Sequence, residues 1–298
     1  MEKVEFLGLT NCYRIFNDTV DLIATTDIGP NIIRFGFVGD RNEFIPDPPP
    51  DKTPSGFGGH TLRHAPEAIE REFPARDPLA VEKHDGSLRI TQPTDKTGIQ
   101  KEMDIPASIT GNHLSIMHRL YNRGLWPVEL APWASSIMAD GGKAIIPLPP
   151  RIPQNSGGPL LPTSCIAVWC YCDLTDPRMV LGKKYVMLKQ DTNLPGSYKI
   201  GMLVPDGWAA YYNNGHLFVV TYEYQKEGIY PDYYSSVECW SGMAFELETL
   251  APFVTLKPGA SVEYAENWYL FRDVPEPKND SDIDRNIMPL IEKTKPSV

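Results

Sequence analysis

Two glutamates, Glu246 and Glu248, lie two residues apart in the stretch AFELETLAPF, residues 244–253. Side chains two residues apart on a β-strand point to the same face, so Phe245 and Leu247 point to the opposite one. If the apolar pair packs on the core, the two carboxylates share a face that is either open to solvent or the floor of a cleft. Two neighbouring carboxylates raise the pKa of one of them, which suits a general base near neutral pH.

A second group of polar side chains lies in FGGHTLRHAPE, residues 57–67, and comprises His60, Arg63, His64 and Glu67. The two glycines let the backbone turn sharply or approach a ligand closely, so we expect a loop that presents an imidazole and a guanidinium to a polyol. The spacing of the two histidines would align metal ligands on a helix, but the glycines and the proline disfavour that helix. A solvated turn without a ligand is the alternative.

Residues 211–252 interleave tyrosines and tryptophans with acidic residues. Aromatic rings pack on the C–H faces of sugar rings, and carboxylates accept hydrogen bonds from hydroxyl groups. This mixture is what a neutral carbohydrate site requires, although the same composition is also normal for a buried core. The candidate binding residues in this segment are Tyr230, Asp232, Glu238 and Trp240.

One further histidine, His118, alternates with Ile116 and Leu120 in the apolar segment 114–122. The period of two predicts that its side chain is buried beside the core of a sheet. His118 is also kept among the candidate substrate-binding residues.

Strand-like segments dominate the chain, and 29 prolines and 23 glycines separate them. The expected strands lie in residues 20–29, 31–39, 87–94, 99–106, 114–122, 165–172, 216–224, 242–250 and 261–271. Helical periodicity is confined to residues 65–73 and 281–293. Short strands without alternating helices predict an all-β sandwich rather than a parallel sheet. We expect one β-sandwich domain over residues 1–273 and a C-terminal extension over residues 274–298 with a short helix.

The composition excludes several kinds of partner. The net charge is −10 and no basic stripe is present, so nucleic acid and anionic membranes are not expected to bind. We expect no signal peptide and no membrane span, because no long apolar run occurs.

Five cysteines, three of them spaced C-x4-C-x-C in residues 165–172, fit neither a disulfide framework nor a zinc ribbon. The alternation of apolar residues predicts a buried strand in residues 165–172. We expect the protein in a reducing cytoplasm. We also expect that it needs no cofactor and that any metal is dispensable. The Pro-rich segments 45–59 and 146–162 should be long loops.

Several segments resemble the galactose mutarotase-like (aldose 1-epimerase) superfamily. FELETLAPFVTLKPGASVEYAENWYLF, residues 245–271, is similar to its C-terminal end, where a Glu-Thr pair on a strand precedes an L-x-P-G turn and a last strand that ends in an aromatic residue. GFGGHTLRHAPE resembles its Gly-Gly/His segment, and YNRGLWPVELAPWA resembles its N-x-G…P strand pair. A bacterial branch with GGH-x-L-x-x-A-P-E and Y-P-D…E-L-E-x-L-x-P segments is more similar still. The likeness covers most of residues 1–273.

The resemblance implies a β-supersandwich with few short helices, whose concave face binds a sugar. In epimerases of this superfamily a glutamate removes the proton of the anomeric hydroxyl, and a histidine protonates the ring oxygen. By its position before Thr249, Glu248 matches the base, and Glu246 is its neighbour on the same face. The acid histidine has no match, because the corresponding stretch ELAPWASSIM carries Trp133 near that position.

Three functions therefore remain open. The first is interconversion of sugar anomers by Glu248 and a histidine, either His60 or His64 from the Gly-Gly segment. The second is carbohydrate binding without turnover, through Arg63 and the aromatic and acidic residues named above. The third is a metal-assisted hydrolase or lyase that uses both histidines of that segment and Glu67. The sequence assigns neither the sugar nor an oligomeric state.

Overall fold

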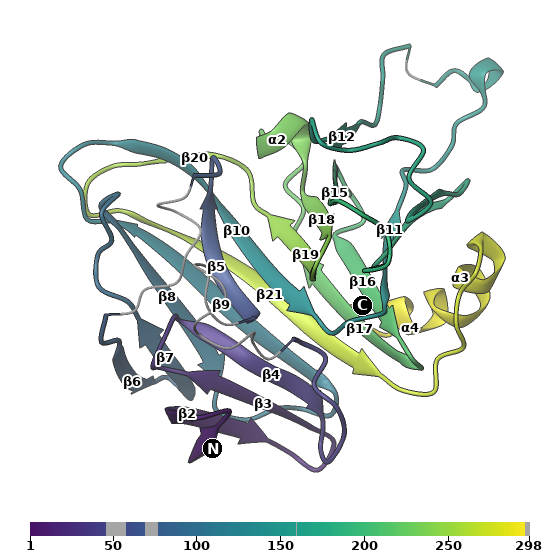
Figure 1. Cartoon of the computed structure of the whole chain (residues 1–298). Coiled ribbons are helices and arrows are strands. Elements are labelled where there is room, and N and C mark those ends of the chain that lie inside the picture. The colour runs from purple at the N-terminus through teal and green to yellow at the C-terminus, as the bar shows by residue number, and fades with distance from the viewer. Residues whose placement is uncertain (46–57, 69–76, 159, 296–298) are drawn as a thin grey trace.

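The computed structural model describes residues 1–45, 58–68, 77–158 and 160–295 (Figure 1). Over these ranges the chain forms two large antiparallel sheets and a few short helices, which confirms the predicted all-β fold. In the first sheet, the strands follow in the order β1 (Glu2–Phe6), β2 (Leu9–Phe16), β3 (Val20–Thr25), β4 (Asn31–Phe37), β5 (Gly59–Ala65), β10 (Val128–Met138), β19 (Phe245–Leu250), β18 (Val237–Ser241), β15 (Tyr198–Met202) and β12 (Ile166–Val168), and β20 (Val254–Leu256) pairs with β10.

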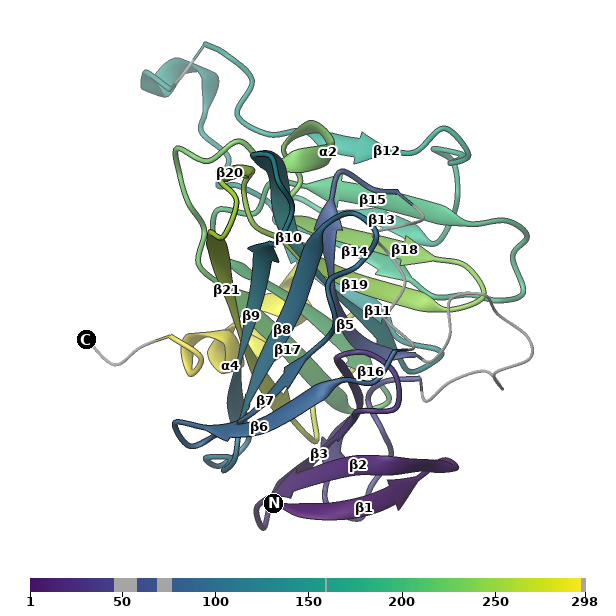
Figure 2. The ribbon, with the colours of Figure 1, turned by 90° about the vertical axis from the view of Figure 1, so that its left-hand side faces the viewer.

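In the second sheet, the order is β13 (Met179–Leu181), β14 (Tyr185–Lys189), β11 (Lys143–Pro147), β16 (Trp208–Asn213), β17 (His216–Tyr222), β21 (Ser261–Phe271), β9 (His113–Asn122), β8 (Ile99–Pro106), β7 (Ser87–Thr91) and β6 (Ala80–His84). The two sheets lie face to face, with β5, β10 and β19 over β9, β21 and β17 (Figures 1 and 2). Of the helices in the described part of the chain, none has the length and apolar character needed to cross a membrane.

The core lies between the sheets and follows from the alternation along each strand. Phe35 from the first sheet contacts Phe218 and Trp268 from the second, with ring centroids 6.1 and 5.6 Å apart. On β19, Phe245 and Leu247 also belong to this core. The apolar face of AFELETLAPF therefore packs as the sequence predicts, and its glutamates lie on the other side of the first sheet.

The C-terminal segment covers part of the outer face of the second sheet, over β11, β14, β16 and β17 (Figure 1). It forms α3 (Asp280–Asn286) and α4 (Met288–Glu292), where the sequence predicts a single helix over residues 281–293. The side chain of Asn279 caps α3, and Pro289 stands in the first turn of α4, where proline is tolerated. Ile283, Ile287 and Ile291 pack on apolar side chains of β11, β14, β16 and β17.

Three local predictions need correction. The Gly-Gly segment is not a loop but strand β5, which pairs with β4 and with β10. The predicted strand over residues 165–172 is limited to β12, and the cysteines beyond it are exposed or partly buried, so the alternation there reflects no buried strand. Residues 65–68 of the predicted helix 65–73 are not helical, and the rest lies outside the described residues. Most of the predicted loop 45–59 also lies outside the described residues.

Two short elements remain: α2 (Pro231–Tyr234) follows β17, and a 3-10 turn (Gln154–Ser156) lies in the loop after β11. This loop projects from the body of the molecule, as Figure 1 shows. Between Pro147 and Ile166 the described residues form no strand, which matches the predicted loop 146–162.

Gly59 is the first residue of β5 and should be hard to replace. Its φ is +93°, and a Cβ atom there would lie 2.3 Å from the carbonyl oxygen of Ile32 on β4. We expect Gly59→Ala to lower the free energy of unfolding by about 2–3 kcal/mol, since the strained backbone and the clash act together. Gly39→Ala is the control, because Gly39 also has positive φ (+76°) but open space around it, and it should cost about 1 kcal/mol. Equal losses in urea denaturation would contradict this account of Gly59.

Candidate functional site

Charged side chains gather on the outer face of the first sheet, at its middle strands. Residues that lie opposite each other on neighbouring antiparallel strands point to the same face. Glu248 on β19 lies opposite Ser135 on β10 and opposite Glu238 on β18. Arg63 on β5 lies opposite Trp133, two residues before Ser135 on β10. We call Arg63, Ser135, Lys199, Glu238, Glu246 and Glu248 the charged face.

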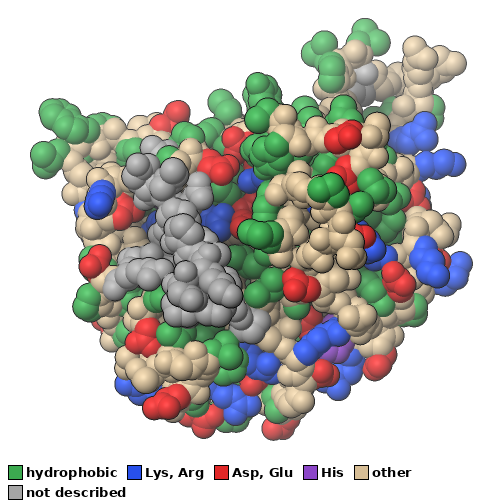
Figure 3. Space-filling view, viewed as in Figure 1, with side chains coloured by type: hydrophobic (Ala, Val, Ile, Leu, Met, Phe, Trp, Pro, Cys, Tyr) green, Lys and Arg blue, Asp and Glu red, His purple; other side chains and the backbone are tan. Residues whose placement is uncertain are grey.

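Ion pairs connect the charged face across β5, β19, β18 and β15. The Nζ atom of Lys199 lies 2.9 Å from Glu238 and 3.1 Å from Glu248, between the two carboxylates. The Nη1 atom of Arg63 lies 3.1 Å from Glu246 and 3.4 Å from Glu248. Two cations thus hold three carboxylates, and Glu248 contacts both cations. In the space-filling view, acidic and basic side chains meet near the middle of this face, between hydrophobic ones (Figure 3).

Two tryptophans flank the cations. The ring of Trp133 lies 5.2 Å from the Arg63 guanidinium and 5.1 Å from Lys199 Nζ, and Trp169 lies 4.6 Å from the same ammonium. Cations over aromatic faces gain electrostatic attraction, which helps to hold them in place. Trp133 thus contacts both cations of the charged face.

Burial sets the protonation of the three carboxyl groups. It raises the pKa of Glu248 to about 7, against the opposing effect of Lys199. It also raises the pKa of Glu238 well above its usual value, again against Lys199. Burial acts in the same direction on Glu246, but Arg63 and a hydrogen bond from Glu248 bring the pKa of Glu246 below its usual value. At neutral pH the face therefore holds an ionised carboxylate, Glu246, and a carboxyl group near its pKa, Glu248, beside a third carboxyl group, Glu238, whose pKa burial raises. Such a set can both accept and donate a proton.

Three other residues that were predicted to bind the sugar lie on or next to the charged face. Trp240 lies opposite Glu246 and Lys199 and therefore belongs to the same face. Glu67 lies 3.8 Å from the Lys199 ammonium. Asp232 in α2 is close enough for its charge to raise the pKa of Glu238.

Tyr230 stands apart from this group. It is buried, its ring stacks on Tyr224, and its hydroxyl accepts a hydrogen bond from the backbone of Gln225. These contacts fix the turn before α2, and they give Tyr230 a structural role next to the site.

The predicted histidines lie on the other side of the sheet. His60 is opposite Ser136, which is opposite Leu247, so its side chain points to the core between the sheets. His64 has the same phase on β5 and is also buried. The structure therefore does not bring either histidine to Glu248, because the backbone of the first sheet lies between them. The segment was predicted to be a loop, in which side chains do not alternate between two faces, so the sequence could not show which way the histidines point.

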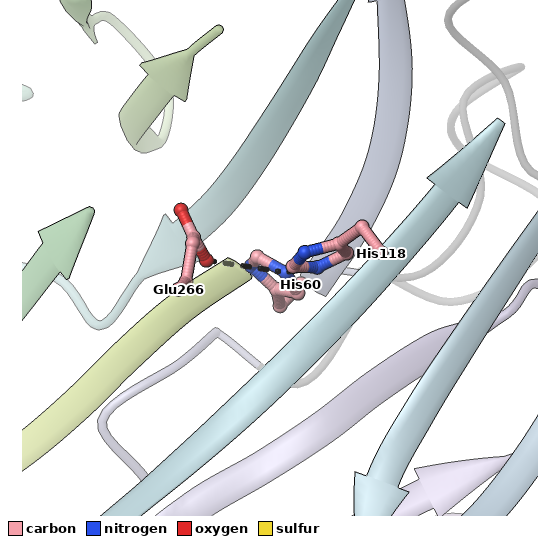
Figure 4. Close-up of side chains that lie close together, drawn as sticks. All are labelled: His60, His118 and Glu266. Carbon is pink, nitrogen blue, oxygen red and sulfur yellow. Dashed lines mark hydrogen bonds and ion pairs between the residues drawn. The ribbon is translucent and has the colours of Figure 1, made fainter. Parts of the chain in front are cut away.

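His118 also points into the core, as its alternation predicts, and not to the charged face. Its Nε2 atom lies 2.8 Å from Nε2 of His60, and Glu266 on β21 lies beside them (Figure 4). Burial lowers the pKa of His60 well below its usual value and that of His118 to about 4, so both imidazoles are neutral. Among the described residues, these three form a group whose donor atoms could hold a metal ion. The ligand set His60, His64 and Glu67 considered above does not converge, since Glu67 contacts Lys199 on the charged face.

Two members of the charged face were missed in the sequence, Lys199 and Ser135. Lys199 lies between Tyr198 and Ile200 in a strand whose five residues are all buried. A lysine in such a strand needs an acidic partner, because an unpaired buried charge is costly. That lysine is the signal that could have led to the site.

Comparison with known proteins identifies the fold. The galactose mutarotase-like protein from Lactobacillus casei ATCC 334 superposes with a TM-score of 0.56 at 12% identity, over 88% of this chain and 100% of that one. The Slr1438 protein from Synechocystis sp. PCC 6803 gives 0.52 at 11% identity, over 88% and 96%. A galactose mutarotase related enzyme from Lactobacillus acidophilus gives 0.51 at 10% identity, over 90% and 99%. The chain thus has the galactose mutarotase-like fold.

Two comparisons of the sequence found no match. No family model matches the chain, and no curated protein matches it.

Proposed function

We propose that this protein binds a sugar on the charged face and interconverts its anomers by acid–base chemistry, as an aldose 1-epimerase does. The observation that carries the proposal is the position of Glu248, next to Glu246 and opposite Glu238, with Lys199 and Arg63 between the carboxylates. The likeness to galactose mutarotase-like structures supports a sugar as the ligand. Trp169, which is partly exposed beside Lys199, supplies a flat apolar surface of the kind that packs on sugar rings.

In the proposed reaction, ionised Glu248 takes the proton of the anomeric hydroxyl. The C1–O5 bond of the ring breaks, C1 and O1 form a carbonyl group, and a protonated carboxyl group gives its proton to O5. Reclosure on the other face of the carbonyl yields the other anomer. Glu238 is the proposed acid, because it lies opposite Glu248 and burial raises its pKa well above the usual value. O1 and O5 are bonded to the same carbon, so two neighbouring carboxyl groups suit both proton transfers.

A second function, sugar binding without turnover, is favoured by a different observation. The side chains of Glu238 and Glu248 have no exposure to solvent, whereas that of Glu246 is 20% exposed. If the sugar does not contact Glu238 and Glu248, these two carboxylates would only hold Arg63 and Lys199 in position. Arg63, Glu246 and Trp240 would then bind the sugar.

The rate of anomer exchange as a function of pH tests the first function. Polarimetry on freshly dissolved α-glucose, α-galactose and further aldoses should show mutarotation above the buffer rate. A base must be ionised, so the rate should rise with pH, with a midpoint near the pKa of Glu248, about 7. Saturable sugar binding in calorimetry with mutarotation at the buffer rate would instead establish the binding function. If no sugar in the panel binds and none is turned over, both proposals fail.

A further inference from the structure

A second cluster of polar side chains lies behind the charged face, in the core between the sheets. His60 comes from β5, His118 from β9 and Glu266 from β21, and their exposed fractions are 0%, 1% and 2%. The Nε2 atoms of the two histidines are 2.8 Å apart, and Nε2 of His60 lies 3.6 Å from Oε2 of Glu266. Figure 4 shows the two imidazoles side by side, with the carboxylate pointing toward His60.

Neighbouring groups fix the orientation of all three side chains. The Nδ1–H group of His118 donates to the backbone carbonyl of Tyr264 at 3.1 Å, so in the neutral ring Nε2 carries a lone pair. Nδ1 of His60 lies 2.9 Å from the hydroxyl oxygen of Ser136. Metal-binding histidines typically use their second nitrogen in this way, to hold the ring in place.

The carboxylate is held in the same manner. Glu266 accepts hydrogen bonds from the hydroxyl group of Thr249 and, at 2.9 Å, from the indole N–H of Trp268. Each of these bonds leaves a further lone pair on the carboxylate oxygen. Buried neutral imidazoles and a hydrogen-bonded carboxylate are the donors that zinc and similar divalent ions take.

We propose that His60, His118 and Glu266 form a binding site for a divalent transition-metal ion of the zinc type. With zinc about 2.0–2.1 Å from each nitrogen, two nitrogens lie about 3.3 Å apart at the tetrahedral angle. The two Nε2 atoms are 2.8 Å apart, so uptake requires them to separate by about half an ångström. The 3.6 Å between His60 and Glu266 requires a smaller contraction. In the absence of the ion, a proton on Nε2 of His60 bridges the two rings.

The position of the cluster indicates what the ion would do. It would join β5 of the first sheet to β9 and β21 of the second. Arg63 of the charged face stands on β5, and Thr249, which donates to Glu266, directly follows Glu248 on β19. The ion would therefore fix two of the strands that carry the charged face, β5 and β19, from the opposite side of the sheet. This proposal does not depend on the proposed function.

Metal binding by the tag-free full-length chain tests the proposal. After treatment with a chelator and dialysis, the protein should take up one equivalent of Zn²⁺ in competition with a chromophoric chelator. Co²⁺ should give the strong visible absorption of a tetrahedral site, and either ion should raise the temperature of unfolding. If the wild type takes up no stoichiometric Zn²⁺ or Co²⁺ at micromolar concentration, the proposal is overturned.

Two variants locate the ion. Glu266→Gln keeps an oxygen that can accept from Thr249 or Trp268, and His118→Gln replaces the second ring; each should bind Zn²⁺ at least 10-fold more weakly. His113→Gln is the control, since His113 is on β9 too but stacks on Tyr269, and its affinity should be unchanged. Wild-type affinity in Glu266→Gln and His118→Gln would place the ion elsewhere and overturn the assignment. If neither variant folds, the wild-type titration and its Co²⁺ spectrum decide.

Discussion

Glu248→Gln is expected to slow anomer interconversion by about 10²–10⁴-fold. The amide cannot accept the proton of the anomeric hydroxyl, and no other carboxyl group on the charged face contacts both cations. The fold should persist, because Lys199 keeps its pair with Glu238 and Arg63 keeps its pair with Glu246. Polarimetry on wild type and variant measures the effect, and a cooperative thermal transition confirms that the variant is folded.

The matched control is Glu263→Gln on β21. Glu263 pairs with Arg119 on the outer face of the second sheet and is 57% exposed, so its replacement should leave the rate unchanged. A Glu248→Gln protein that binds and turns over every sugar of the panel like the wild type would refute the assignment of the site. Weaker sugar binding, with no mutarotation in the wild type, would favour the binding function instead.

Period-two alternation allowed much of the fold to be predicted. It placed most of the long strands, and it put Glu246 and Glu248 on one face and Phe245 and Leu247 on the other. Such predictions succeed because they depend on local residues alone. The helix over residues 281–293 was also predicted, apart from its interruption before Pro289.

The site itself could be predicted only in part, because it depends on which strands pair and in which register. The pairing of β18 with β19 brings Glu238 to Glu248, and β15 then brings Lys199 to both. No local pattern contains that information. The Gly-Gly segment was misjudged for a different reason: Gly59 takes a positive φ at the start of a strand, where glycines more often indicate a turn. With β5 taken as a loop, the sequence could not show that His60 faces the core.

Lys199→Met is expected to lower the free energy of unfolding by about 3–5 kcal/mol at pH 8 to 9. The substitution keeps the apolar stem of the side chain and removes the ammonium group that lies within 3.1 Å of Glu238 and Glu248. Both carboxyl groups then remain buried without this cation. Of these two glutamates, Arg63 contacts only Glu248, at 3.4 Å, so it replaces the lost ion pairs only in part.

The loss should depend on pH in a definite direction. Burial raises the pKa of both glutamates in the folded state, and loss of the ammonium raises it further. The folded variant then binds more protons than the unfolded chain at pH values above the ordinary pKa of glutamate, so its stability falls as pH rises through that window. At lower pH a larger fraction of both groups is protonated in the folded variant, so at pH 5 the loss relative to wild type should be smaller.

Urea denaturation of wild type and variant at pH 5 and pH 8.5 measures both effects. Lys184→Met is the matched control, because Lys184 pairs with Asp284 on the surface at 2.7 Å and is 61% exposed. Surface pairs of this kind contribute about 0–1 kcal/mol, so the control should change little at either pH. Equal losses for the two variants, or a Lys199→Met loss that does not grow with pH, would show that Glu238 and Glu248 are not held as buried charges by Lys199.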